Sequence, residues 1–108
     1  MICNYLIIRD GFLIAIEQSK SCLAHYPGTS YTHWCEEISG TCPKISTTVP
    51  FVDPRGYAEK RRCAYMIESD LEYAGYRARV EIDGDDDATA KVDWLAARAA
   101  IKAKYPKP

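Results

Sequence analysis

The stretch Tyr5–Ile16, YLIIRDGFLIAI, decides how the fold begins. Two apolar runs rich in strand-forming residues flank Asp10-Gly11, and this arrangement is the strongest short-range signal of a β-hairpin. Apolar residues at helical spacing from Phe12 to Tyr26 leave a helix as the alternative for the second run. A compromise ends the second strand near residue 17 and places a short helix over 20–26. We predict the hairpin.

The next segments give weaker signals. Pro-Gly, Ser-Gly and Thr-Cys-Pro steps in residues 27–43 predict a short strand or turn framed by loops. Alternating apolar residues from Ile45 to Phe51 predict a strand, and Pro50 places it at a sheet edge because proline has no amide hydrogen. An exposed edge of this kind can pair with a second copy, so a homodimer remains an open alternative.

Two helices and one more strand are predicted after residue 52. Asp53 as N-cap, Pro54 in the first turn and a stop at Gly75 predict a helix over 54–74. Apolar and charged residues alternate over 76–83, which predicts a strand. A final helix over 87–105 follows an acidic turn. The side chains expected to face inward are Tyr57, Ala64, Ile67, Leu71 and Ala74 on the first helix, and Val92, Leu95, Ala96, Ala99 and Ala103 on the last.

These elements predict an α+β fold within one domain, 1–108. A small mixed or antiparallel sheet, made of the N-terminal hairpin, the edge strand and strand 76–83, is packed by two amphipathic helices over about 54–74 and 87–105. The net charge is −1, so the chain lacks the excess of positive charge that direct nucleic-acid binding requires. No apolar run approaches the roughly 20 residues of a membrane span, and the N-terminal residues do not form a leader pattern. We expect a cytoplasmic protein with neither nucleic acid nor membrane as its partner.

The five cysteines are an odd number in a chain without an export signal, which predicts reduced thiols. Zinc needs four thiolate or imidazole ligands, and the spacing of Cys22 and His25 would suit half of such a site. The other spacings are irregular, so buried thiols and loop histidines are the simpler interpretation, and no cofactor is expected. A disulfide between Cys35 and Cys42 is an alternative in an oxidising compartment. The candidate zinc ligands are Cys22, His25, His33, Cys35 and Cys42.

No catalytic motif is recognisable, and we predict no catalytic residues. The chain has no Gly-rich phosphate loop and no Gly-x-Ser-x-Gly elbow. Asp83, Asp85 and Asp87 begin like a calcium loop, but Ala88 replaces its glycine and Trp94 replaces its closing glutamate. An acidic turn that stabilises a helix N-terminus is the better explanation. A small enzyme in which a histidine activates a cysteine is kept as an alternative.

Charge placement favours a protein partner. The long helix carries basic residues in its first half and acidic residues in its last turns, which is opposite to the order that the helix dipole favours. Eight of the fifteen acidic residues lie between Glu68 and Asp87. Such a negative patch suits docking on a basic surface, although solvated turns would explain the same residues without a function.

Two aromatic residues of the last helix complete the predicted site. Trp94 and Tyr105 share a side with Ile101, away from the expected inward stripe, where aromatics either pack beneath a loop or anchor a partner. The predicted partner-binding residues are therefore Glu68, Asp70, Glu72, Glu81, Asp83, Asp85, Asp86, Trp94 and Tyr105.

The leading hypothesis is a non-enzymatic inhibitor or adaptor that binds a protein with a basic surface, such as a nucleic-acid-binding protein or complex. Small chains without motifs commonly serve phages and mobile elements, so an anti-CRISPR-type inhibitor of a host defence nuclease is one form of this hypothesis. The alternatives are a zinc-stabilised or cysteine-dependent module centred on residues 22–42, and a small enzyme.

Overall fold

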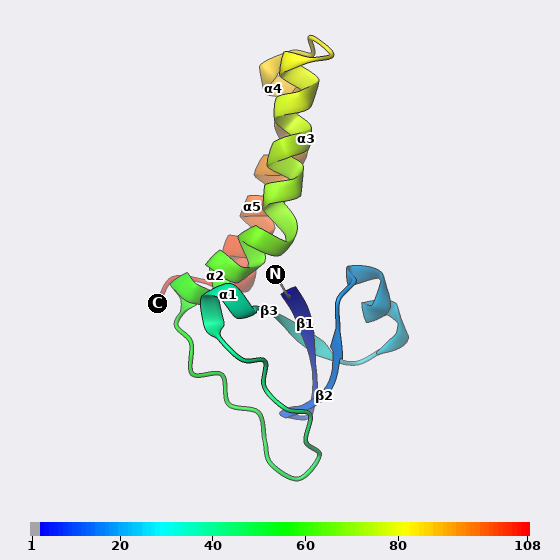
Figure 1. Cartoon of the computed structure of the whole chain (residues 1–108), viewed down its shortest axis with the longest axis vertical. Helices are drawn as coiled ribbons and strands as arrows, with labels where there is room; N and C mark the ends of the chain where they lie inside the picture. The colour runs from blue at the N-terminus through cyan, green and yellow to red at the C-terminus, as the bar shows by residue number, and fades with distance from the viewer. Residues whose placement is uncertain (1–2) are drawn as a thin grey trace.

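The computed structural model describes residues 3–108. Its first half is an antiparallel sheet with the strand order β2-β1-β3, formed by β1 (Cys3–Arg9), β2 (Phe12–Glu17) and β3 (Ser30–Cys35) (Figure 1). Asp10 and Gly11 join β1 to β2 with φ angles of 54° and 85°. Two positive φ angles are what the tight hairpin turn of the Asp-Gly type requires, so the predicted hairpin is confirmed.

The helix alternative for residues 12–26 is wrong, and the compromise is confirmed. The second strand ends at Glu17, and the short 3-10 helix η1 (Lys20–His25) follows it. The weakly patterned residues 27–43 contain β3, which pairs with β1 in register from Cys3 opposite Cys35 to Ile8 opposite Ser30. Because β1 lies between two neighbours, its residues Asn4–Ile7 are all buried.

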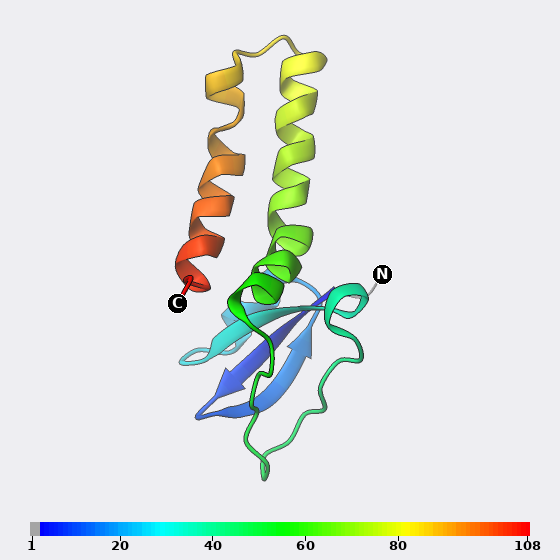
Figure 2. The same cartoon turned by 90° about the vertical axis from the view of Figure 1, so that its left-hand side faces the viewer.

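The second half is a long helical hairpin. After α1 (Glu36–Ser39), residues 40–56 form no regular element, and the chain then rises through α2 (Tyr57–Ala64), the π-helical turn η2 (Tyr65–Ser69) and α3 (Asp70–Glu81). It returns through α4 (Asp87–Ala90) and α5 (Val92–Lys104). Figure 2 shows α3 and α5 side by side, projecting from the sheet, in a molecule of 54 × 30 × 25 Å. We call the projecting part, residues 70–100, the arm and the remainder the base.

The predicted α+β class is confirmed, but the strand over 76–83 is wrong. Helix α3 continues through Gly75 to Glu81. The alternating apolar residues of 76–83 are also compatible with a helix. Buried Tyr76 and half-buried Val80 lie four residues apart, which places them on one helix face. The segment is rich in Ala, Arg and Glu, which favour helix, and Arg77 pairs with Glu81 one turn later. These local preferences outweigh the cost of one exposed glycine.

The predicted edge strand over 45–51 is also wrong. This segment is a loop that touches the β2 edge through two backbone hydrogen bonds, from Ser46 N–H to the Leu13 carbonyl (3.1 Å) and from Phe51 N–H to the Gly11 carbonyl (2.8 Å). Between them, the Ser46 hydroxyl accepts a hydrogen bond from Val49 N–H at 3.0 Å and turns the chain. In this loop Ile45 and Val49 are exposed, whereas Phe51 packs against the core cluster of Leu6, Leu13 and Trp34, so the alternating pattern does not mark a strand.

Helix boundaries differ from the prediction at two places. The first long helix begins at Tyr57 with Gly56 as its N-cap, whereas Asp53 and Pro54 lie in the preceding loop. The predicted helix over 87–105 is interrupted at Lys91, where α4 passes into α5, and Asp86 caps α4 by accepting a hydrogen bond from Thr89 N–H.

The faces of the last helix are reversed relative to the prediction. Trp94, Ile101 and Tyr105 point into the molecule, whereas the stripe expected to face inward is exposed along its whole length. On the first long helical run, Ala64 is buried and Tyr57 and Ile67 are half-buried, as predicted, whereas Leu71 and Ala74 on α3 are exposed. The exposed members of the predicted inward faces are thus Leu71, Ala74, Val92, Leu95, Ala96, Ala99 and Ala103. Within the described residues 3–108, no helix combines the length and apolarity needed to cross a bilayer.

Candidate functional site

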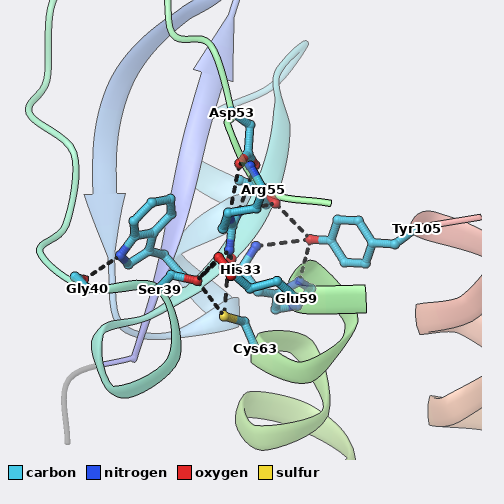
Figure 3. A network of polar contacts seen from close by, with 10 residues as sticks. His33, Ser39, Gly40, Asp53, Arg55, Glu59, Cys63 and Tyr105 are labelled. Atoms are coloured by element: carbon cyan, nitrogen blue, oxygen red, sulfur yellow. Dashed lines mark hydrogen bonds and ion pairs between the residues drawn. The ribbon is translucent and has the colours of Figure 1, made fainter. Parts of the chain in front are cut away.

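Arg55 joins the sheet to the helices at the centre of a buried polar network (Figure 3). Its Nη1 donates to the His33 carbonyl oxygen at 2.7 Å, and its Nε and Nη2 donate to the two carboxylate oxygens of Asp53 at 2.9 and 2.8 Å. The guanidinium also lies 4.3 Å from the ring centroid of Trp34. Burial opposes ionisation of Asp53, but the hydrogen bonds from Arg55 lower its pKa overall. Asp53 is thus a counter-ion and not the predicted helix cap.

Tyr105 closes the outer edge of β3. Its hydroxyl accepts a hydrogen bond from the backbone N–H of His33 at 3.0 Å and lies 2.7 Å from Nδ1 of the same histidine and 3.0 Å from Oγ1 of Thr32 (Figure 3). Tyr105 and Arg55 together satisfy both backbone polar groups of His33 on a strand edge that would otherwise be open. Tyr105 is only 7% exposed, so this predicted partner-binding residue lies in the interior.

Glu68, the first residue of the predicted acidic patch, is an internal counter-ion. Its Oε1 accepts a hydrogen bond from the Tyr5 hydroxyl at 3.0 Å and lies 2.8 Å from Nζ of Lys20. Its Oε2 lies 3.0 Å from Nε2 of His33, but off the axis of a directed hydrogen bond, so this buried nitrogen has no well-aligned partner among the described residues. The His33 imidazole and the Lys20 ammonium lower the pKa of Glu68 to about 2, and burial lowers the pKa of His33.

A cavity of about 310 Å³ opens beside Glu68, between η1, α3 and α5. Among the groups that line it, the polar ones come from Tyr5, Lys20, Glu68 and Glu72. His33 contacts both Tyr105 and Glu68, and of these three residues Glu68 alone lines the cavity. No thiol or aliphatic hydroxyl is among the residues that line the cavity. The arrangement holds the Glu68 carboxylate in place between the Lys20 ammonium and the Tyr5 hydroxyl at the wall of the cavity.

Trp94 holds the arm together. Its ring stacks on Tyr76 with centroids 5.6 Å apart and an interplanar angle of 2°, and it lies 5.0 Å from Tyr73. Trp94 is half-buried by these contacts. The predicted partner-binding residue Trp94 therefore packs against α3, and only part of its ring remains exposed for a partner.

The face of α3 that carries Leu71, which we call the outer face, is apolar and exposed, and Leu71 itself also lines the cavity beside Glu68. Leu71 and Ile82 are 75% and 80% exposed and lie three helical turns apart on one face, with Ala74 and Ala78 between them. Both large side chains have an acidic residue on each side in the sequence. The two triplets are Asp70-Leu71-Glu72 and Glu81-Ile82-Asp83, and all six residues are exposed. On α5, Val92 and Leu95 are 57% and 46% exposed.

The acidic turn at the tip is partly neutralised. Nε of Arg79 lies 2.8 Å from Asp85, Arg77 pairs with Glu81, and Lys91 pairs with Asp87 at 3.4 Å. Of the predicted acidic residues, the structure therefore groups Glu81, Asp83, Asp85 and Asp86 at the tip, Asp70 and Glu72 at the root of the arm, and Glu68 inside the base.

The candidate zinc ligands are dispersed. Cys22 and His25 lie on η1, whereas His33 and Cys35 are buried in β3, and Cys42 lies near the Asn4 side chain. Over residues 3–108, no three His, Cys, Asp or Glu side chains are arranged to hold a metal ion. The sulfur next to Cys35 is that of Cys3, at 3.0 Å, so the alternative Cys35–Cys42 disulfide is not formed, and all five thiols are free.

Sequence reasoning missed the Arg55 and Glu68 networks. The one local signal was the Asp-Pro-Arg sequence at 53–55, which looks like a helix start. The chain matches no protein-family model, no curated protein and no solved structure. Its function is therefore argued from its own surfaces.

Proposed function

We propose that this protein is a non-enzymatic inhibitor or adaptor that binds another protein through the outer face of α3, with α5 contributing Val92 and Leu95. The observation that carries the proposal is that Leu71 and Ile82 remain 75% and 80% exposed although the same chain buries smaller apolar residues in its base. Isolated exposed apolar residues are ordinary on protein surfaces. A repeated set on one projecting helix is typical of an interaction surface.

Burial of this face would contribute favourably to binding. Fully burying one Leu, Ile or Val side chain contributes about 1.5–3 kcal/mol. Of the four large exposed residues, Leu71, Val92 and Leu95 stand on helices and Ile82 is the C-cap residue of α3, so they lose little backbone freedom on binding. A projecting pair of helices can lie in a groove of a partner as helical ligands do.

Charge complementarity favours a partner whose groove is lined by basic residues. The carboxylates that flank Leu71 and Ile82 would meet cations on both sides of each apolar contact. Such contacts steer association and depend on salt, whereas the apolar contacts determine how long the complex lasts. The proposal keeps four carboxylates of the predicted acidic patch, those of Asp70, Glu72, Glu81 and Asp83. It leaves out Glu68 and Tyr105, because their side chains are occupied inside the base.

The test is quantitative capture of partners from native lysate by the tagged protein and by the Leu71→Ser/Ile82→Ser variant. We expect the variant to lose a partner that wild type retains at moderate salt. The matched control is Ile45→Ser/Val49→Ser, which removes two similarly exposed residues from the loop on the base and should leave capture unchanged. Asp70→Lys/Glu72→Lys should weaken capture most at low salt, while leaving the internal contacts of Glu68 intact.

Sedimentation of the purified protein tests whether a second copy of this chain, and not another protein, covers the outer face of α3. A wild-type dimer that Leu71→Ser/Ile82→Ser converts to monomer would assign this face to a second copy and contradict the proposal. Equal capture by wild type and the folded variant would contradict it as well.

A further inference from the structure

Two cysteines face each other where β1 begins and β3 ends. Cys3 and Cys35 are direct partners in the antiparallel ladder, and their Sγ atoms lie 3.0 Å apart. Directly opposite Cα atoms in such a ladder are about 4.5 or 5.5 Å apart, and both values fall within the range that disulfides span. Joining the two sulfurs therefore needs side-chain rotation and little movement of the backbone.

The other thiols have different neighbours. Cys63 contacts the Ser39 hydroxyl at 3.3 Å and lies 3.6 Å from Nη1 of Arg55, and Cys42 lies 3.8 Å from the side-chain nitrogen of Asn4. Among the described residues, the ladder thus brings together one pair of opposed thiols.

We propose that Cys3 and Cys35 are a redox-sensitive pair that closes to an intramolecular disulfide when the protein meets a small-molecule disulfide such as oxidised glutathione. In the first step the Cys3 thiolate attacks one glutathione sulfur, forming a mixed disulfide and releasing one reduced glutathione. In the second, the Cys35 thiolate attacks the Cys3 sulfur and releases the other glutathione. The protein loses two protons and two electrons, and one oxidised glutathione becomes two reduced molecules.

Exposure determines the order of the two steps. Cys3 is partly exposed, whereas Cys35 is completely buried, so only Cys3 is open to an external reagent. Cys35 then acts as the resolving thiol from inside the sheet. Its Sγ donates a hydrogen bond to Sδ of Met66 in η2 at 3.1 Å, and the disulfide has no proton to donate. Oxidation therefore ends a contact between the sheet and the π-helical turn below the arm.

The surroundings of Cys3 make the reaction slow at neutral pH. Burial and the hydrogen bond to Cys35, with Cys63 on α2 and Glu37 on α1 nearby, raise the pKa of Cys3 to about 12. The thiolate fraction then increases about tenfold for each pH unit between pH 7 and 10. An ordinary exposed thiol would level off above about pH 8.5. The pair responds to sustained oxidation and not to a brief pulse.

The experiment uses the full chain with Cys22→Ser/Cys42→Ser, which leaves Cys3, Cys35 and Cys63. Incubation with oxidised glutathione should leave one free thiol of three, and trypsin should yield peptide 1–9 joined to peptide 21–44. The rate should rise about tenfold per pH unit up to pH 10. In the same background, Cys3→Ser should block the bond, while Cys63→Ala should leave it unchanged.

Three outcomes would overturn the proposal. These are three free thiols after prolonged oxidation at pH 10, a stable mixed disulfide with glutathione in place of the internal bond, and a cross-link between Cys63 and either partner. Cys3→Ser changes a partly exposed residue at the start of the chain, so its folding is expected to survive, and circular dichroism checks this.

Discussion

The base and the arm use side chains in opposite ways. In the base, charged and polar groups are buried and joined to one another, as in the contacts of Arg55 with Asp53 and of Glu68 with Tyr5. On the arm, the ion pairs are at the surface, as in Arg77 with Glu81, and the large apolar residues Leu71 and Ile82 lie beside them in solvent. The base therefore contains the buried polar networks, while the arm carries the exposed apolar residues on which we propose that a partner docks.

The junction between the two regions is the π-helical turn η2. Its residue Ile67 packs against the sheet cluster of Tyr5 and Ile7, and Ser69 is fully buried at its end. One extra residue in a helical turn shifts the face that the rest of the helix presents. Helix α3 thereby leaves the sheet with its aromatic side toward α5 and its Leu71 side toward solvent.

The largest effect is expected from Arg55→Met. Its side chain is 2% exposed, and its loss leaves the Asp53 carboxylate and the His33 carbonyl oxygen without their partner. Removing one member of a buried pair costs about 3–5 kcal/mol. Urea unfolding measures the change. Arg77→Met is the matched control, because its ion pair with Glu81 lies at the surface and contributes far less to stability than a buried pair. Equal losses in the two variants would refute the contrast between base and arm.

Glu68→Gln should remove a stabilisation that depends on pH. Because the folded-state pKa of about 2 lies below the usual value of 4.5, the unfolded chain takes up protons first as the pH falls. The stabilisation is present above about pH 4.5 and is lost as the pH approaches 2. We expect wild type to exceed Glu68→Gln by up to about 3 kcal/mol at pH 6, and the difference to shrink below pH 4.5.

Unfolding free energies of wild type and Glu68→Gln from pH 6 to pH 2.5 provide this measurement. Glu72→Gln is the control, because Glu72 is an exposed neighbour on α3, and its difference from wild type should stay within about 0.5 kcal/mol. A wild-type advantage over Glu68→Gln that persists undiminished at low pH would show that the carboxylate is not the stabilising form.

Tyr105→Phe should have a smaller effect on the same base. The variant keeps the ring and removes the hydroxyl that accepts the His33 N–H and contacts Thr32, so a buried strand-edge amide loses its partner. The expected loss is about 1–3 kcal/mol. Tyr73→Phe on the arm is the control, since Tyr73 is 45% exposed. Hydrogen exchange of the His33 amide should accelerate in Tyr105→Phe, and unchanged exchange would contradict this role of the hydroxyl.

The N-terminal hairpin and the fold class were predictable from the sequence. Asp10-Gly11 specified the hairpin because few residues other than Gly, Asn and Asp accept positive φ, and the α+β class followed from the mixture of patterns. Strand 76–83 was mispredicted because an eight-residue alternation also contains the helical pair Tyr76 and Val80. Period alone does not separate the two over so short a segment.

The candidate site was less predictable, because it depends on which faces meet. The last helix is apolar on two sides, and the sequence does not state that Trp94 packs inside and Leu95 remains outside. In the sequence Glu68 resembles the surface acids that follow it, but its partners Lys20 and His33 come from segments 48 and 35 residues earlier. Long-range partners of this kind leave no pattern in the local sequence.

The smallest expected effect is that of Leu95→Ser, and it tests directly whether the outer face of α5 is exposed. Leu95→Ser should lower the unfolding free energy by only about 1 kcal/mol, because about half of the side chain is already exposed and only the remaining half loses its burial. Ile101→Ser, six residues later on the inner side of the same helix, should cost several kcal/mol, because Ile101 is only 2% exposed and packs against Ala64. A large loss in Leu95→Ser, measured at a concentration where the protein is monomeric, would mean that the outer face of α5 is covered within the chain. The arm would then be an ordinary packed element, and the argument from its exposed apolar residues would fail.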